Sequence, residues 1–333
     1  MFSLCGACPG QDDVRESMMR QRIVTVIGAT GLQGGGLVRA ILEAPGEGFR
    51  VRAVTRTPDS PNARRLAALG VDVVRADLDD EASLDQAFAG AEGAFCVTNF
   101  WEHFSPEHEL RQTAAMARAA GRARLCHVVW STLEDTRRFV PVDDARIPTL
   151  MGRYKVPHFD AKGEANRLFL ELGVPTTFLL TSFYWDNFIS FGMEPRRAAD
   201  GVLELALPLG DHALPGIAAG DIGRCAYALL REGERHVGET VGVAGEHLTG
   251  KAMAAALTDA LGQLVRFCDV PLEAYRRSGI PGSQELANMF QFKREFSDAF
   301  RGVRDVEATR RLHPALQTFS SWLAANSGRI PLG

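Results

Sequence analysis

The residues best suited to chemistry begin with a glycine-rich run, Gly28-Ala29-Thr30-Gly31-Leu32-Gln33-Gly34, between a β-branched stretch and a segment with helical spacing. The first two glycines permit a sharp turn and a close backbone approach to a diphosphate, and the third lets the helix pack tightly. Amides at the start of that helix would face the anion. The run therefore predicts a dinucleotide site at Gly28, Thr30, Gly31, Leu32, Gln33 and Gly34.

A second signal for a cofactor lies at Val54-Thr55-Arg56, where the second expected strand ends. An acidic residue there would accept from the ribose 2′-hydroxyl of NAD, whereas an arginine pairs with a 2′-phosphate. Arg56 therefore favours NADP(H). Three residues that follow later strands are expected on the same cofactor edge, although each could equally cap a helix: Asp77, near the adenine, and Thr98 and Asn99.

Hydride chemistry needs a hydroxyl to hold the substrate, an acid to protonate it, and a lysine that lowers the pKa of that acid and holds the cofactor ribose, for which Lys162 is the candidate. Ser131 follows the fifth expected strand, and His158 and Lys162 stand four apart on one helix face. This is the spacing of the Tyr-x-x-x-Lys pair of short-chain dehydrogenases, with histidine in place of tyrosine and Tyr154 one turn earlier. Three interpretations of this pair stay open. His158 itself donates the proton, Lys162 acts directly as the catalytic group, or the site has lost catalytic turnover and only binds the cofactor. Phe183, in an aromatic cluster after the sixth expected strand, is expected to bind the cofactor at its nicotinamide end, although it could equally be an ordinary core residue.

The elements that must position these residues alternate between strands and helices. Strands are predicted at 22–27, 49–54, 71–74, 94–97, 125–130 and 176–180, with helices at 62–69, 83–88, 106–120 (stopped by Gly121) and 159–172. Such alternation requires parallel pairing. The fold class is therefore α/β, a doubly wound Rossmann sheet with helices on both faces. Residues 21–180 form the expected NADP-binding domain, residues 1–20 an expected disordered tail, and residues 181–333 a smaller α+β lobe, with some segments returning to the sheet.

Composition excludes several classes of protein. The chain has 333 residues, 46% hydrophobic and 23% charged, with a net charge of about −4, which fits a globular protein and argues against direct nucleic-acid binding. Six scattered cysteines are expected as reduced thiols, and no metal site is expected because Cys5 and Cys8 have no second ligand pair. Without a long apolar stretch, no membrane partner is expected, and the expected location is cytoplasmic.

Five segments together resemble the NmrA-like family of atypical short-chain dehydrogenases. They are residues 28–35, 54–56, 97–102, 158–164 and 285–290, and the resemblance runs from about residue 22 to 323. It implies a Rossmann domain that prefers NADP(H), a smaller C-terminal lobe and a homodimer. Some members are redox sensors that report the NADPH/NADP ratio through a regulatory protein partner. Other members are reductases with a catalytic lysine in a Phe-x-x-Lys segment, which Phe159-Asp-Ala-Lys162 matches.

Two functions follow as hypotheses. The first is a redox-responsive regulator, because an intact cofactor loop stands beside an incomplete Tyr-x-x-x-Lys pair. The second is an NADPH-dependent reductase of small carbonyl, enone or aromatic substrates, because residues 137–156 are longer than in the sensor members and a long loop there could shape a pocket for a small-molecule substrate.

Overall fold

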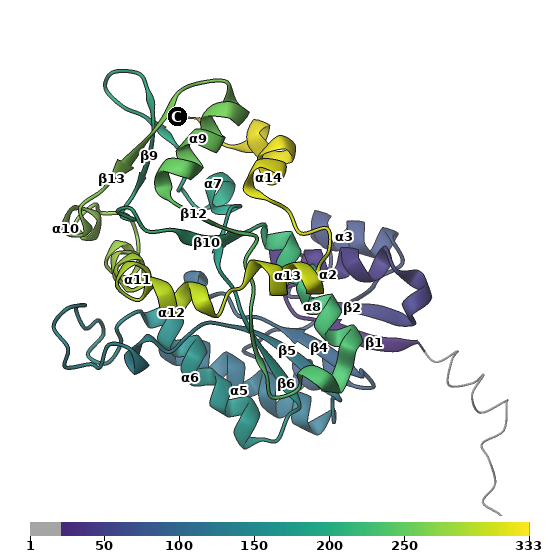
Figure 1. Ribbon diagram of the computed structural model, residues 1–333. Helices are drawn as coiled ribbons and strands as arrows, with labels where there is room; N and C mark the ends of the chain where they lie inside the picture. The colour runs from purple at the N-terminus through teal and green to yellow at the C-terminus, as the bar shows by residue number, and fades with distance from the viewer. Residues whose placement is uncertain (1–20, 333) are drawn as a thin grey trace, which may run out of the picture.

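The central feature of the protein is a seven-stranded parallel sheet (Figure 1). The computed structural model describes residues 21–332, so the predicted tail 1–20 lies outside the described residues. The strands of the sheet are β1 (Arg22–Val26), β2 (Phe49–Thr55), β3 (Asp72–Arg75), β4 (Gly93–Cys96), β5 (His127–Thr132), β6 (Thr176–Leu180) and β11 (Thr240–Gly242). Their order, β11-β6-β5-β4-β1-β2-β3, contains the Rossmann order, which confirms the predicted fold class.

Helices cover both faces of this sheet, as the alternation predicts. One face carries α2 (Leu32–Leu42) and α8 (Ala219–Glu232), and α3 (Pro61–Ala68) lies near β3. The other carries α4 (Glu81–Phe88), α5 (Pro106–Arg122) and α6 (Pro157–Glu171). Figure 1 shows α5 and α6 below the sheet. Every residue of β4 and β5 is buried, because a strand covered on both faces has no solvent side.

The C-terminal half adds two three-stranded sheets and a second hydrophobic core. The sheets are β12-β10-β7 and β13-β9-β8. Their strands are β7 (Phe183–Tyr184), β8 (Arg196–Arg197), β9 (Leu203–Leu207), β10 (Leu214–Ile217), β12 (Glu246–Leu248) and β13 (Val265–Asp269). The helices are α7 (Asn187–Ser190), α9 (Gly250–Leu261), α10 (Leu272–Arg276), α11 (Ser283–Glu295), α12 (Ser297–Gly302), α13 (Val306–Leu312) and α14 (Phe319–Asn326). This core lies beyond the carboxyl ends of the main sheet.

The structure corrects the sequence reading at three places. The sixth and last strand predicted for the sheet, β6, is not its edge, because β11, from the C-terminal half, pairs outside it. With only three residues and a glycine, β11 is too short for a periodic signal. Helix α5 does not stop at Gly121 but continues to Arg122. Strand β5 continues through Thr132, so Ser131 lies inside the strand rather than after it.

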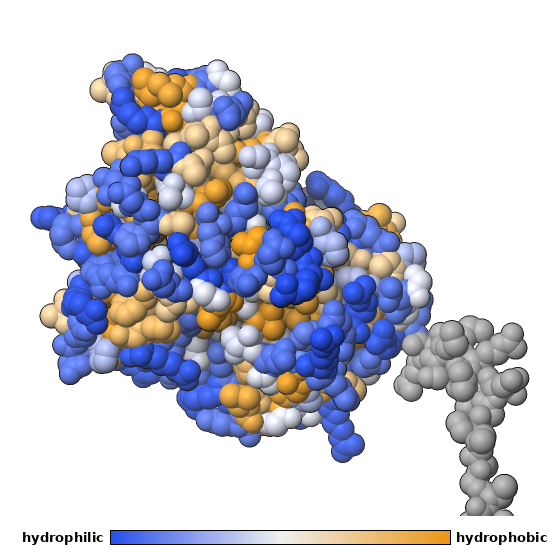
Figure 2. Space-filling model, viewed as in Figure 1, coloured by the Kyte–Doolittle hydropathy of each residue, from blue (hydrophilic) through white to orange (hydrophobic). Residues whose placement is uncertain are grey.

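The molecular surface seen in Figure 2 is mostly hydrophilic, with groups of hydrophobic residues between the charged ones. Over residues 21–332, every helix is too short or too polar to cross a membrane. The homodimer stays a prediction.

Candidate functional site

The glycine-rich run forms the turn from β1 into α2. Gly28 has a φ of +67°, in the left-handed region that side chains other than glycine's rarely adopt. Gly31 caps α2 and offers no side-chain acceptor to the first turn. The first amides of a helix have no partner within the helix, so those of Leu32, Gln33 and Gly34 are available to an anion.

Gly34 shows how tightly the turn and the helix fit. A Cβ at this position would lie 2.4 Å from the carbonyl oxygen of Gly28, closer than real contacts allow. Only glycine lets the helix start so close to the turn. The resulting cradle fits the diphosphate of a dinucleotide, which the first amides of α2 would hold.

Arg56 extends from the end of β2, and its side chain is already paired. Its guanidinium donates to Glu102 through Nη2 to Oε1 at 3.0 Å, and Nη1 lies 3.0 Å from Oε2. Asn99 Nδ2 donates to the same Oε1 at 3.1 Å. Glu102 belongs to a short 3-10 helix, η2 (Phe100–Glu102), after β4. The carboxylate thus holds the guanidinium in the two-pronged geometry that a phosphate would use.

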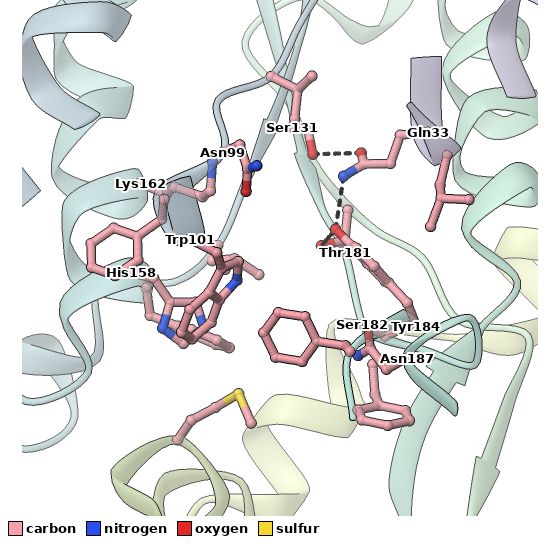
Figure 3. A pocket seen from close by; sticks show the side chains of 18 of the residues that line it. Gln33, Asn99, Trp101, Ser131, His158, Lys162, Thr181, Ser182, Tyr184 and Asn187 are labelled. Atoms are coloured by element: carbon pink, nitrogen blue, oxygen red, sulfur yellow. Dashed lines mark hydrogen bonds between the residues drawn. The ribbon is translucent and has the colours of Figure 1, made fainter. Parts of the chain in front are cut away.

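A pocket of about 360 Å³ lies where β4, β5 and β6 end, beside the start of α2 (Figure 3). Open α/β sheets bind ligands at this edge. Figure 3 shows Gln33 and Ser131 on one side of the pocket and Trp101 and His158 on the other. From the C-terminal half, α11 adds Leu286, Met289 and Lys293.

A chain of hydrogen bonds runs along one wall of the pocket. Ser131 Oγ donates to Gln33 Oε1 at 2.8 Å, and Gln33 Nε2 donates to Tyr184 Oη at 2.8 Å. Tyr184 Oη also lies 3.2 Å from Thr181 Oγ1. Burial raises the pKa of Tyr184, against the smaller opposing effect of these two hydrogen bonds. The Ser131 proton is therefore committed to Gln33, and the hydroxyl presents lone pairs to the pocket.

Lys162 stands in a buried ion pair across the two helices α5 and α6. Its Nζ lies 2.7 Å from Glu109 Oε1 and donates to Thr98 Oγ1 at 2.6 Å and to the Thr98 carbonyl oxygen at 3.2 Å. Glu109 is fully buried. Burial opposes its ionisation, but the Lys162 charge and hydrogen bonds from His103, Lys162 and Thr98 outweigh this and hold the pKa of Glu109 at about 2. The three protons of the ammonium thus have three acceptors.

His158 is held by a carboxylate from the C-terminal half. Its backbone amide and its Nδ1 approach the same oxygen, Glu285 Oε1, at 2.5 and 2.6 Å. An ionised carboxylate only accepts, so Nδ1 carries the proton of this contact. The ring lies against Trp101, with centroids 4.8 Å apart. This fixes the imidazole and leaves Nε2 for exchange with a ligand.

The structure brings most of the predicted site residues together. Those that line the pocket are Leu32, Gln33, Thr98, Asn99, Ser131, His158, Lys162 and Phe183. Those that form the adjoining turn are Gly28, Thr30, Gly31 and Gly34. Arg56 stands at the end of β2 and does not line the pocket.

Besides Arg56, two predicted residues lie outside both the pocket and the glycine-rich turn. Asp77 accepts from the amide of Asp79 through its carboxylate, in a turn after β3. Tyr154 is buried outside the pocket, with its ring near Arg153 and its hydroxyl 3.4 Å from Glu107. Burial raises the pKa of Tyr154 to about 12. Its position does not suit a proton donor to a ligand in this pocket.

Sequence reasoning missed both carboxylates that hold the basic residues. A signal exists for Glu109, which stands four and seven residues before buried Thr113 and Met116 on the inner face of α5. A charge on an apolar helix face indicates a partner. Glu285 gives no such local signal, because 127 residues separate it from His158.

The sheet order, the glycine turn and the pocket together define a Rossmann-fold dinucleotide-binding protein. The chain belongs to the NmrA-like family, whose model matches residues 20–323, as its motifs predict. The NmrA-like family domain-containing oxidoreductase lnbB of Aspergillus flavus is 28% identical over 289 residues, 82% of this chain and 83% of that relative. An NAD(P)H azoreductase of Xenophilus azovorans is 29% identical over 311 residues, 92% of this chain and 98% of that relative.

Solved structures agree with this fold. NmrA, a negative transcriptional regulator, in complex with NADP has a TM-score of 0.72 at 23% identity and covers 92% of this chain and 95% of its own. The same regulator has also been solved with NAD. Similarity to these structures therefore leaves the choice between NAD and NADP to the residues of this chain.

Proposed function

We propose that this protein is an NADPH-dependent reductase of small carbonyl, enone or aromatic substrates, with His158 as its proton donor. The observation that carries the proposal is the pocket itself. It joins the start of α2, where a cofactor diphosphate would bind, to an imidazole and an ammonium on one face of α6. The oxidoreductase and azoreductase names of the relatives support the same class of reaction.

NADPH is the proposed cofactor because of Arg56. No acidic residue ends β2, and Arg56 presents a fork of donors that matches a 2′-phosphate. The amides of Leu32, Gln33 and Gly34 would hold the diphosphate, and the bound cofactor would supply a hydride to the substrate.

The site distinguishes two roles among its basic residues. Lys162 has Glu109 and two Thr98 oxygens as acceptors, so it contributes a fixed positive charge rather than a free proton. His158 is fixed through Nδ1 by Glu285. As the imidazolium it can pass the Nε2 proton to a substrate atom that gains electrons, which leaves the neutral imidazole with its proton on Nδ1. We therefore assign proton donation to His158 and stabilisation of developing negative charge to Lys162.

The test is a panel of quinones, enones, aldehydes and azo compounds, followed by loss of NADPH absorbance. His158→Gln is expected to lower kcat by about 10²-fold or more, the typical contribution of general acid catalysis, with NADPH affinity retained. His212→Gln, the same exchange at an exposed histidine outside the pocket, serves as the control. Turnover of no compound, or a kcat unchanged by His158→Gln, would remove the assignment.

One observation favours a second candidate function, a cofactor-responsive regulator. The Arg56–Glu102 ion pair ties β2 to η2, and Trp101 of η2 lines the pocket. A 2′-phosphate would compete with Glu102 for the guanidinium and so release η2. This contact distinguishes NADP(H) from NAD(H) but not NADPH from NADP, so redox sensing would need a further contact at the pocket.

Hydrogen exchange of residues 97–105 tests the regulator. Protection is expected to change with NADP and NADPH but not with NAD, and Glu102→Gln is expected to abolish the difference. The predicted homodimer and regulatory protein partner belong to this candidate, and a cofactor-dependent change in sedimentation would support them. Identical exchange with all three nucleotides would contradict it.

A further inference from the structure

The lysines of this chain are few and placed unusually. The sequence has four lysines against 33 arginines. Three of the four, Lys155, Lys162 and Lys293, are buried, although lysine is among the residues least often buried. Lysine therefore occupies three interior positions in a chain whose other basic residues are nearly all arginine. A compact ammonium, rather than a planar guanidinium, is what these positions share.

Two of these buried lysines have complete sets of acceptors. Lys155 Nζ donates to the carbonyl oxygens of Asp144 and Ile147 at 2.6 and 2.8 Å and to Thr149 Oγ1 at 2.9 Å. Lys162 is bound by Glu109 and Thr98, as described above. The ammonium groups of both lysines therefore find their acceptors within the fold.

Lys293 differs from them in its surroundings. Its side chain is 6% exposed, and within residues 21–332 its ammonium has neither a hydrogen-bond acceptor nor a carboxylate within ion-pair distance. The nearby carboxylate of Glu134 is paired with Arg304, whose Nη2 donates to Glu134 Oε2 at 2.9 Å. Burial, with the Arg304 charge, lowers the pKa of Lys293 to about 7, and Glu134 opposes this in part.

Aromatic rings surround the Lys293 ammonium instead of acceptors. Nζ lies 5.5, 5.9 and 5.4 Å from the ring centroids of Phe159, Phe290 and Phe300. Lys293 nevertheless lines the same pocket as His158 and Lys162, so its side chain borders the space that a ligand would fill. An ammonium at the wall of a pocket without a counter-ion is a candidate site for an anion.

Much of the remaining pocket lining is apolar or aromatic. Its walls include Trp101, Phe183, Phe191, Met193 and Met289. Flat rings and thioethers favour an aromatic ligand, through stacking and sulfur contacts.

We propose that Lys293 recognises the substrate: the pocket takes an aromatic compound with an acidic oxygen group, a carboxylate or a phenolate, and Lys293 pairs with that group. The ring of the substrate lies among the aromatic walls, and its reducible part lies toward His158. This inference rests on the proposed function, whose substrate class it narrows.

Matched pairs of ligands test this by calorimetry on the NADP-loaded protein. The probes are benzoate and benzamide, cinnamate and cinnamamide, and 2-naphthoate and 2-naphthamide, with 4-nitrophenolate against nitrobenzene for the phenolate. At least one anion is expected to bind at least tenfold more tightly than its neutral partner. Lys293→Met is expected to abolish this preference, and Lys251→Met, at an exposed lysine paired with Asp211, is expected to keep it. No preference for any anion, or a preference that survives Lys293→Met, would overturn the proposal.

A second measurement does not depend on the Lys293→Met variant. Protein labelled with ¹³C-lysine has only four lysine Cε signals from this sequence. One is expected to titrate near neutral pH, to disappear in Lys293→Arg, and to titrate at higher pH with a bound aromatic acid. The charged groups that act on it are Arg304 and Glu134. A saturating aromatic acid that shifts none of the four lysine titrations would overturn the proposal.

The outcomes separate this inference from the proposed function. Preferential binding of an aromatic acid through Lys293 without NADPH oxidation would retain the binding site and remove the reductase. NADPH-dependent reduction of neutral compounds, with no preference for acids, would retain the reductase and remove the role of Lys293.

Discussion

The buried Lys162–Glu109 ion pair permits a quantitative prediction about stability. In Glu109→Gln the amide oxygen can still accept from Lys162 and Thr98, but the negative charge is lost. The ammonium of Lys162 then stays buried without a counter-ion, the situation in which breaking a buried pair costs about 3–5 kcal/mol.

The pKa of Glu109 gives the same magnitude independently. Its fall from 4.5 to about 2 on folding corresponds to about 3 kcal/mol of stability at neutral pH. Because the folded pKa is depressed, this stability is present above the unfolded value of 4.5 and disappears as pH falls through about 2. At about pH 3.5 roughly 2 kcal/mol should remain.

Urea unfolding followed by tryptophan fluorescence measures this, since Trp130 lies 5.1 Å from Lys162 Nζ. Glu81→Gln is the matched control. Hydrogen bonds from Arg118 and Arg122 also lower the pKa of Glu81 to about 2, yet its side chain is 33% exposed. A surface pair contributes about 0–1 kcal/mol, so the control should lose little. Equal losses in the two variants would refute the argument from burial, as would a Glu109→Gln loss that does not shrink at low pH.

Three further predictions follow from the site and its packing. Glu102→Gln removes the ion-pair partner of Arg56, and calorimetry should show NADP(H) binding tightened by about 1 kcal/mol and NAD(H) binding unchanged. Equal tightening of both would contradict competition between Glu102 and the 2′-phosphate for Arg56. Gly36→Ala places a Cβ 2.2 Å from the Gly220 carbonyl oxygen where α2 meets α8, and should cost about 1–3 kcal/mol in urea unfolding; an unchanged midpoint would show that the helices separate freely. Exposed Cys126 should react with a disulfide reagent well before the two buried thiols, whose pKa burial raises, and simultaneous reaction would argue against this core. The buried thiols are Cys96 and Cys225.

Local pattern was enough to predict the cofactor side of the fold. One continuous stretch of sequence holds the strand, the turn at Gly28 and the helix that follows. Its β-branched residues and glycines therefore predict this unit together. The parallel sheet follows from the alternation of elements. Segments of the C-terminal half were expected to return to the sheet, but the position of the edge strand β11 was not predicted, because its three residues join the sheet through pairing with β6, which no local pattern encodes.

For the same reason, only part of the candidate site could be predicted from the sequence. Spacing placed His158 and Lys162 on one helix face, and the structure confirms that both line one pocket. Their partners are distant in sequence: Glu285 comes from α11, and Glu109 from α5. The chemistry of each basic residue depends on its partner, so sequence alone left the acid unassigned.

Helix α11 contributes both to the proton donor and to the proposed substrate site, and we infer that substrate specificity resides there. It supplies Glu285 to orient the imidazole and, two turns later, Lys293 to the pocket wall, so one rigid element links the proton donor to the proposed anion site. In the proposed function the start of α2 and Arg56 bind the cofactor, and Arg56 does not line the pocket. A change of substrate class would then be expected from substitutions on α11, at Met289 or Lys293, while cofactor preference stays with Arg56. Exchange of Lys293 that altered NADP affinity as strongly as ligand affinity would show that the two halves of the pocket are not separable in this way.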